Sequence, residues 1–134
     1  MSDPLDELIV DECEALDKNL LASIVTGYVR ITKTGEVLFD KSFYNLPQAK
    51  KVVLCLLSRK IIKIKNLIDN FEEGIRPAEI SKLTGIKPKN VTGYLSNDLK
   101  GLTISSKGAH IIPNYNLYKC EELMRLENSK GSSY

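Results

Sequence analysis

The stretch of sequence that decides the fold runs from Ile75 to Pro113 and reads IRPAEISKLTGIKPKNVTGYLSNDLKGLTISSKGAHIIP. Two short helices are expected in its first half. Pro77 suits the first position of one helix, and Gly85 ends that helix because glycine readily takes the left-handed conformation. Pro88 begins the second helix, which closes at Gly101. The sequence therefore predicts two short helices joined by a tight turn.

The apolar residues of these helices indicate which faces point into a core. In the first helix we expect Ile80 and Leu83 to be buried. In the second, Val91, Leu95 and Leu99 recur at spacings of four, which places them on one inward stripe. The remaining faces of the second helix carry polar residues.

The second half of the stretch predicts a β-hairpin. The segments Leu102 to Ser105 and Ala109 to Ile112 are typical of strands, and Ser106-Lys107-Gly108 is typical of the tight turn between them. The predicted order is therefore helix, turn, helix and hairpin.

This order resembles the winged helix-turn-helix superfamily. The segments that carry the resemblance are AEISKLTGI, VTGYLSNDLKGL and TISSKGAHIIP, and it extends from Leu46 to Pro113 if the preceding long helix is included. The resemblance implies that the helix Pro88–Leu99 enters the DNA major groove as a recognition helix. It also implies that the hairpin Leu102–Ile112 lies as a wing against the sugar-phosphate backbone or the minor groove.

The outward side chains of the second helix agree with DNA binding. Asn pairs with adenine through two hydrogen bonds, Thr offers a methyl group to thymine, and Lys reaches guanine or phosphate oxygens. A glycine inside a helix costs about 1 kcal/mol relative to alanine, and close approach of a partner to the backbone at Gly93 would compensate for this cost. The candidate DNA-binding residues are Lys87, Lys89, Asn90, Thr92, Gly93, Ser96, Asn97, Lys100, Lys107 and His110.

Two observations favour other functions. No arginine occurs from Pro77 to Leu123, although arginine is the commonest specific reader of guanine. Winged helices also serve as protein-interaction modules, in which the same surface is merely hydrophilic. The alternative function is therefore a protein-protein interaction module in a transcription or chromosome-handling complex, and RNA binding is a third possibility.

The chain before Ile75 predicts three elements. Asp3-Pro4 begins an acidic amphipathic helix that runs to Leu20, and the segment Ser23 to Phe39 predicts a β-hairpin. A long helix begins at Asn45-Leu46-Pro47, and its apolar face is expected to be central to the core. The basic side of this helix, expected to be solvated, consists of Lys50, Lys51, Arg59, Lys60, Lys63 and Lys65.

After the hairpin, Asn114 is expected to cap a last helix that either closes the core or contacts a second subunit. We therefore expect an α+β protein, and its parts divide as follows. Residues 1–45 form the acidic N-terminal helix and a β-hairpin packed on the core, residues 46–127 form a winged helix-turn-helix domain with a C-terminal helix, and residues 128–134 form a disordered tail.

Charge is distributed unevenly along the chain, although its net value is only +2. Residues 1–17 hold seven acidic and no basic side chains, which leaves ten acidic against nineteen basic residues and a net charge of +9 in residues 18–134. A basic body attracts a polyanion such as double-stranded DNA, and the acidic helix either shields that body or contacts a protein partner. The charge distribution by itself is explained equally well by a surface that is only solvated and binds no partner.

Little in the sequence points to catalysis or to a bound metal. The cysteines, Cys13, Cys55 and Cys120, are widely spaced and odd in number, which favours reduced thiols over disulfides or a zinc site. His110 is the only histidine, and no nucleophile or carboxylate lies near it in sequence. We therefore expect a protein that is not an enzyme and uses no cofactor.

Location and assembly follow from the same patterns. No apolar run approaches the roughly 20 residues that a membrane-spanning helix needs, so we expect a cytoplasmic protein. The amphipathic terminal helices exceed what one small core needs, and paired modules recognise paired half-sites. We therefore expect a homodimer on DNA.

Overall fold

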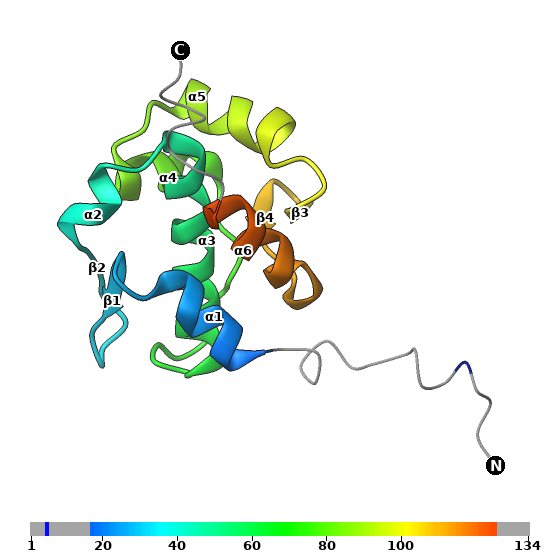
Figure 1. Ribbon diagram of the computed structural model, residues 1–134. Coiled ribbons are helices and arrows are strands. Elements are labelled where there is room, and N and C mark those ends of the chain that lie inside the picture. Colours follow the sequence, from blue (N-terminus) through cyan, green and yellow to red (C-terminus); the bar gives the residue numbers. More distant parts are fainter. Residues whose placement is uncertain (1–4, 6–16, 126–134) are drawn as a thin grey trace.

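The computed structural model describes Leu5 and residues 17–125, which form an α+β arrangement (Figure 1). The helices are α1 (Lys18–Val25), α2 (Lys41–Tyr44), α3 (Gln48–Ile64), α4 (Pro77–Thr84), α5 (Pro88–Gly93) and α6 (Leu117–Arg125). The strands are β1 (Val29–Ile31), β2 (Val37–Phe39), β3 (Ile104–Ser106) and β4 (Ala109–Ile111). Two shorter helical segments complete the set: η2 (Tyr94–Asp98), a π-helix, and η3 (Asn114–Asn116), a 3₁₀ turn.

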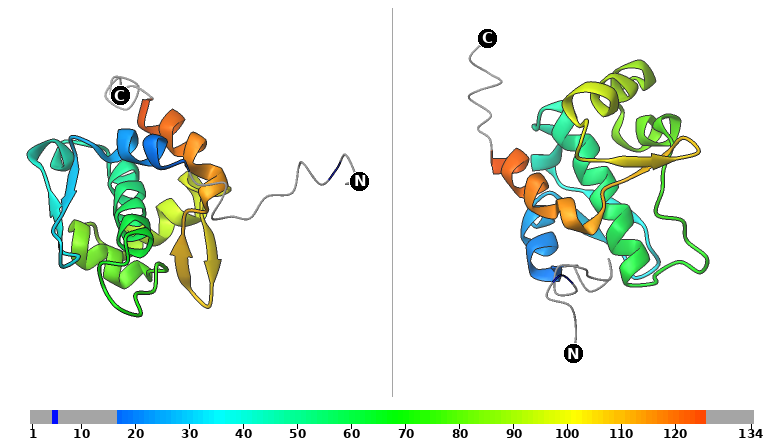
Figure 2. Two further views of the ribbon diagram at one scale, coloured as in Figure 1. Left: turned by 90° about the horizontal axis from the view of Figure 1, so that it is seen from below. Right: turned by 90° about the vertical axis from the view of Figure 1, so that its right-hand side faces the viewer.

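The long helix α3 is the centre of the fold, as predicted. Every residue from Val52 to Ser58 is buried, and the other helices pack around α3 (Figure 2). Helices α1, α4, α5 and α6 contribute Leu21, Ile80, Val91 and Leu117 to the same core. The segment 17–45 therefore shares one hydrophobic core with the rest of the described chain.

Helix α1 corrects one sequence prediction. Ser23, which was expected to begin a strand, lies inside α1 together with Ile24 and Val25. The carboxylate of Asp17 accepts a hydrogen bond from the backbone N–H of Leu20 at 2.9 Å and so caps the helix. The helix buries its apolar face because α1 packs on both α3 and α6. Apart from Leu5, the predicted acidic helix before Asp17 lies outside the described residues.

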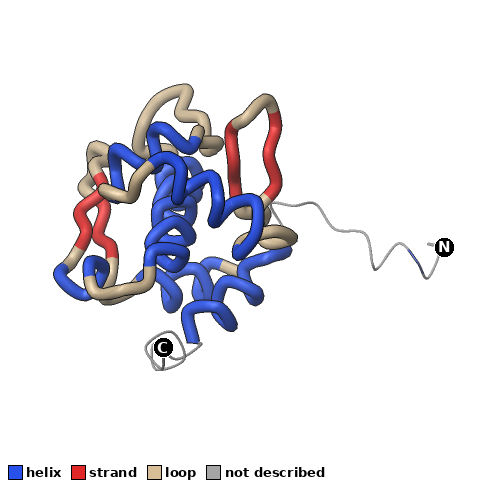
Figure 3. The backbone as a smooth tube through the Cα atoms, turned by 90° about the horizontal axis from the view of Figure 1, so that it is seen from above, coloured by secondary structure: helices blue, strands red, loops and turns tan. Residues whose placement is uncertain are grey.

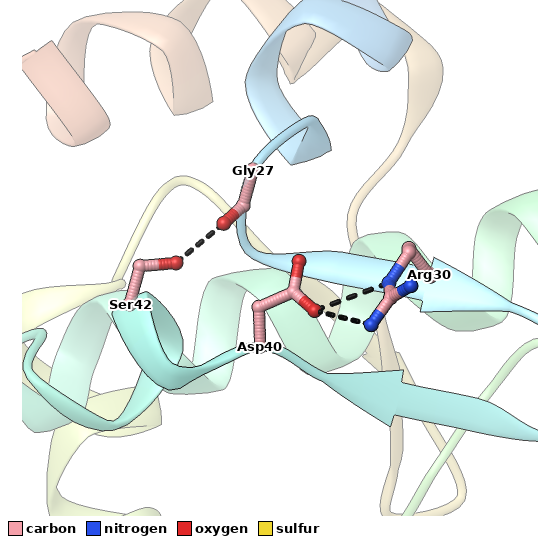
Figure 4. A network of polar contacts seen from close by, with 4 residues as sticks. All are labelled: Gly27, Arg30, Asp40 and Ser42. Atoms are coloured by element: carbon pink, nitrogen blue, oxygen red, sulfur yellow. Dashed lines mark hydrogen bonds and ion pairs between the residues drawn. The ribbon is translucent and has the colours of Figure 1, made fainter.

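The predicted first hairpin is present but begins at Val29, which pairs with Phe39. It lies on the opposite side of the helices from the β3–β4 hairpin (Figure 3). Figure 4 shows how the base of the first hairpin is fastened: the Ser42 hydroxyl donates to the Gly27 carbonyl, and Arg30 forms a 3.0 Å ion pair with Asp40. These contacts join the end of α1 to the start of α2.

The basic side of α3 is largely engaged by the protein, which corrects the expectation of a solvated face. Arg59 donates to the carbonyls of Glu72, Glu73 and Gly74, and Lys63 donates to the carbonyl of Phe71. The loop after α3 returns along the helix, and its carbonyls need donors there. The cations of α3 therefore hold the loop in place.

Lys60 of α3 forms a buried ion pair and a hydrogen bond with residues outside the helix. Its side chain is 3% exposed, and Nζ lies 3.0 Å from the Glu73 carboxylate and 2.7 Å from Oδ1 of Asn114. Asn114 therefore accepts from Lys60, whereas the sequence predicted a helix cap at this position. Lys50 is also buried, and its Nζ donates to the carbonyl of Met124 at 3.3 Å.

The last helix closes the core of its own chain. Leu117 and Cys120 of α6 are buried, and the helix packs on α1 and α3. The side-chain amide of Asn116 donates to the carbonyl of Leu102 at 2.8 Å, which fixes the start of α6 to the second hairpin. The predicted disordered tail, residues 128–134, lies outside the described residues. Within the part of the chain that the structure describes, every helix is too short or too polar to cross a membrane.

Candidate nucleic-acid interface

The two short helices of the candidate site are joined by the tight turn that the sequence predicts. Helix α4 ends at Thr84, and Gly85 follows in the left-handed conformation with φ 82°. The Thr84 hydroxyl donates to the carbonyl of Ile80 at 2.7 Å and accepts from the N–H of Ile86 at 3.3 Å. These bonds fix the direction in which the chain enters α5 at Pro88.

One apolar residue of α4 does not lie where the sequence placed it. Ile80 is fully buried, but Leu83 is 45% exposed. The inward position one turn after Ile80 is occupied by Thr84, which is buried, so Leu83 points to another side of this short helix. Leu83 instead lines a cavity between α4 and the first hairpin.

The second helix continues beyond Gly93 with wider turns. The N–H of Leu99 donates to the carbonyl of Tyr94 at 2.8 Å, a hydrogen bond that spans five residues and marks the π-helix η2. The predicted inward stripe is confirmed because Val91, Leu95 and Leu99 are all buried. Helix α5 and η2 therefore form one element with a single buried face.

The outward face of α5 and η2 has no intramolecular polar contacts among residues 17–125. The candidate residues there, together with those immediately before and after, are exposed: Lys87, Lys89, Asn90, Thr92, Ser96, Asn97 and Lys100. Within those bounds, none of these side chains forms a hydrogen bond or an ion pair. Their hydrogen-bonding groups face solvent.

Gly93 lies in the middle of this face, one helical turn from Lys89 and from Asn97. Its backbone is helical, with φ −62° and ψ −44°, and a Cβ atom built on it would meet nothing within 4 Å. Neither backbone conformation nor internal packing therefore requires glycine at this position.

The predicted second hairpin lies beside the end of η2 (Figure 3). Ile104 pairs with Ile111, and the turn consists of Lys107 and Gly108, both in the left-handed region with φ 53° and 84°. Two consecutive left-handed residues are what a two-residue hairpin turn requires. The exposed Lys107 side chain is therefore held at the tip of the hairpin.

His110 is half-buried in β4. Burial lowers the pKa of its imidazole below the ordinary value of 6.5, and Nδ1 has no hydrogen-bond partner among the described residues. The ring is therefore mainly neutral at pH 7. His110 therefore adds little positive charge to the hairpin at neutral pH.

Arg76 is a further candidate residue that the sequence analysis missed. A Cβ atom built on Gly108 would lie 2.6 Å from Nη1 of Arg76, so the guanidinium lies against the hairpin turn. The side chain is exposed and, among the described residues, forms no ion pair. The segment from Pro77 to Leu123 contains no arginine, but Arg76, directly before it, places one beside the hairpin.

The charge around this face is positive. From Ile80 to Cys120 the chain has six lysines, all exposed, and Asp98 is the only acidic residue before Glu121. Such a surface attracts anions.

The described residues contain no group of three or more His, Cys, Asp or Glu side chains that could hold a metal ion. Burial raises the pKa of the Cys55 and Cys120 thiols to about 12, which keeps both protonated at neutral pH.

Comparisons of the chain with protein-family models, curated proteins and solved structures gave no significant match. Any functional assignment therefore depends on the geometry of the α5–η2 face and the β3–β4 hairpin.

Proposed function

We propose that the chain is a winged helix-turn-helix DNA-binding protein that acts as a small transcriptional regulator or chromatin-associated factor. In this proposal α5 and η2 form the recognition helix, and the β3–β4 hairpin forms the wing. The supporting observation is the outward face of α5 and η2, whose lysines, asparagines and hydroxyls are exposed and make no hydrogen bonds or ion pairs among the described residues. Polar groups arranged in this way are free to bind base edges and phosphates.

The proposed contacts divide into two classes. Lys87, Lys89, Lys100 and Lys107 neutralise phosphates, which gives affinity without sequence preference. Side chains such as Asn90 contact base edges, which gives the sequence preference. Thr92, Ser96, Asn97 and the neutral ring of His110 supply further hydrogen bonds.

The proposed DNA-bound species is a homodimer. Helix α6 is engaged with its own core, but Tyr118 within it and Tyr115 just before it are more than half exposed and provide apolar surface for a second copy. Light scattering at tens of micromolar measures the mass, and a strict monomer both with and without DNA contradicts the dimer. The acidic residues 1–17 are proposed to contact a protein partner or to compete with DNA for the basic surface.

A salt titration tests the phosphate contacts. For four lysines per monomer, the logarithm of the DNA affinity is expected to fall with the logarithm of salt concentration at a slope of about −3.6, and twice that for a dimer. Each Lys→Ala substitution should reduce the slope by about 0.9 per monomer. Lys33→Ala, in the exposed turn of the other hairpin, is the matched control and should leave the slope unchanged.

Substitution of the asparagines tests sequence reading. Asn90→Ala or Asn97→Ala should cost about 1–3 kcal/mol on the preferred duplex, little on random DNA, and leave the salt slope nearly unchanged. Asn19→Ala on the exposed side of α1 is the control. The interaction-module alternative gains support if footprinting finds no preferred site and a captured protein partner tolerates all of these substitutions.

A further inference from the structure

A second candidate site lies on the other side of α4, where a cavity of about 380 Å³ opens between α4, α3, the β1–β2 hairpin and the loop that follows α3. Its volume lies within the range of small-molecule sites, roughly 300–1,000 Å³. The walls are mainly apolar and include Val37, Phe39, Ile62, Ile68, Phe71 and Leu83.

The apolar surface at this cavity is partly exposed. Leu83 is 45% and Ile68 36% exposed, although both are large aliphatic side chains. Removal of such surface from water favours the binding of an apolar group that covers it. The walls therefore favour an apolar ligand.

Arg59 is the cation that lines this cavity. Its Nε and Nη2 atoms donate to backbone carbonyls of the loop after α3, and its Cζ lies 4.5 Å from the centre of the Phe71 ring. Nη1 makes no hydrogen bond within residues 17–125, and no carboxylate there lies close enough for an ion pair. The guanidinium is thus held rigidly with two N–H donors left over. Glu72, Glu73 and Glu79 act on its charge from beyond ion-pair distance, but burial lowers the pKa of Arg59 overall, so the charge is only partly compensated.

Two of the other polar groups that line the cavity, the Ser58 hydroxyl and the Cys55 thiol, are uncharged. The Ser58 hydroxyl donates to the carbonyl of Leu54 at 2.7 Å, and the Cys55 thiol is buried and protonated. The Glu36 carboxylate also lines the cavity, but it is exposed to water at the hairpin turn. Arg59 is the only cation among the residues that line the cavity, and its free N–H donors bind a carboxylate more strongly than a neutral acceptor.

We propose that this cavity binds a small flat hydrocarbon that carries one carboxylate. The hydrocarbon contacts Phe71, Ile62 and Leu83, and the carboxylate accepts hydrogen bonds from Nη1 of Arg59. This site is separate from the α5–η2 face, so its existence does not depend on DNA binding. Since Leu83 belongs to α4, which packs on α5, the ligand contacts the helix that supports the proposed recognition helix.

The test compares 2-naphthoate with 2-naphthamide, which has the same shape but no charge. Binding to the full chain is followed by NMR through the methyl signals of Leu83 and Ile62. We expect 2-naphthoate to bind with a Kd on the order of 1 mM or tighter, and 2-naphthamide to bind about tenfold more weakly. Equal affinities overturn the anionic ligand class, and an absence of shifts for both compounds up to about 10 mM overturns the site.

Paired variants of Leu83 locate the binding without disturbing the core. Leu83→Glu and Leu83→Gln have nearly equal size, so they differ mainly in the charge at the cavity. Leu83→Glu is expected to weaken 2-naphthoate binding about fivefold more than Leu83→Gln does, with no such difference for 2-naphthamide. Arg59→Met, checked for folding by circular dichroism, should abolish the preference for 2-naphthoate. Identical affinities in the two Leu83 variants contradict the proposed location.

Discussion

Ile75 and His110 are joined by two backbone hydrogen bonds, one from each N–H to the other's carbonyl, at 3.1 and 2.8 Å. The pair adds a third segment to the side of the β3–β4 hairpin, directly before α4. Arg76 follows Ile75, so this pairing determines that its guanidinium lies over Gly108. A cation is thereby added to a hairpin whose own exposed charge is Lys107.

Arg76→Gln is expected to weaken DNA binding without altering the fold. If Arg76 contacts a phosphate in addition to the four lysines, the slope of the natural chain is about −4.5 per monomer, and this substitution should bring it to about −3.6. Fluorescence anisotropy over a salt series measures the slope, and circular dichroism checks the fold. Lys33→Gln removes the same charge from the opposite hairpin and should have no effect. An unchanged slope in Arg76→Gln means that this arginine does not touch DNA.

Gly93→Ala is expected to change stability and DNA binding in opposite directions. The backbone is already helical and a methyl group finds open space, so the free energy of unfolding should rise by up to about 1 kcal/mol. In the proposed DNA complex the same methyl group would obstruct close approach of DNA to the backbone, so the affinity for DNA should fall. Urea denaturation and anisotropy measure the two quantities.

The control for this variant is Gly101→Ala. Gly101 also has open space around it but adopts φ 86°, where alanine is strained, so this substitution should destabilise the protein by about 1 kcal/mol. If Gly93→Ala binds DNA as tightly as the natural chain, close backbone approach at Gly93 is refuted.

Glu73→Gln is expected to be strongly destabilising. It leaves the buried Lys60 ammonium without its counter-charge, and breaking a buried ion pair from one side costs about 3–5 kcal/mol. Asp40→Asn breaks the Arg30–Asp40 pair, in which the arginine is 74% exposed, and should cost less than about 1 kcal/mol. Urea denaturation measures the free energy of unfolding of both variants. If the two substitutions lower it by similar amounts, the Lys60–Glu73 ion pair is not buried from water.

The buried thiols predict both a reactivity and a pH dependence. With Cys13 replaced by serine, native protein at pH 8 should resist iodoacetamide, since a thiol of pKa about 12 is only about 0.01% thiolate there, against roughly 10% for an ordinary pKa of 9.0. Urea should restore labelling. Rapid labelling of the native variant, with circular dichroism unchanged, would contradict burial of Cys55 and Cys120.

The sign of the pH effect follows from the raised pKa values. Between pH 9 and 12 the unfolded chain releases thiol protons that the folded chain keeps, so these thiols make stability fall as pH rises through that range, and they have little effect below it. The expected slope is up to about 1.4 kcal/mol per pH unit for each thiol. Cys55→Ala should have a shallower decline, and an equal decline in both proteins contradicts the prediction.

The helices and hairpin of the candidate site could be predicted because local residues set their limits. Gly85 ends α4, Pro88 begins α5, and the Lys107-Gly108 turn fixes the register of β3 and β4. Val91, Leu95 and Leu99 are all buried although the second half of the helix has π-helical turns. The residues predicted to face outward therefore do so.

The predictions that are wrong concern residues whose structure depends on contacts with residues distant in sequence, and not on local secondary-structure preference. Ser23 to Val25 contains two β-branched residues that favour a strand, yet a capped helix that buries its apolar face against α3 and α6 is the observed structure. Lys60 was assigned to solvent because its partner Asn114 lies 54 residues away in sequence. Arg76 was missed for the same reason, since its position depends on the pairing of Ile75 with His110.

The buried ammonium of Lys60 also constrains when the chain can fold during its synthesis. The ribosome makes Lys60 well before Glu73, and it makes Asn114 another 41 residues after Glu73. Until both have emerged, burial of α3 would remove a charge from water without full compensation, which is strongly unfavourable. We therefore expect this end of α3 to stay hydrated in the nascent chain until the second hairpin has been made, and this part of the core to form late.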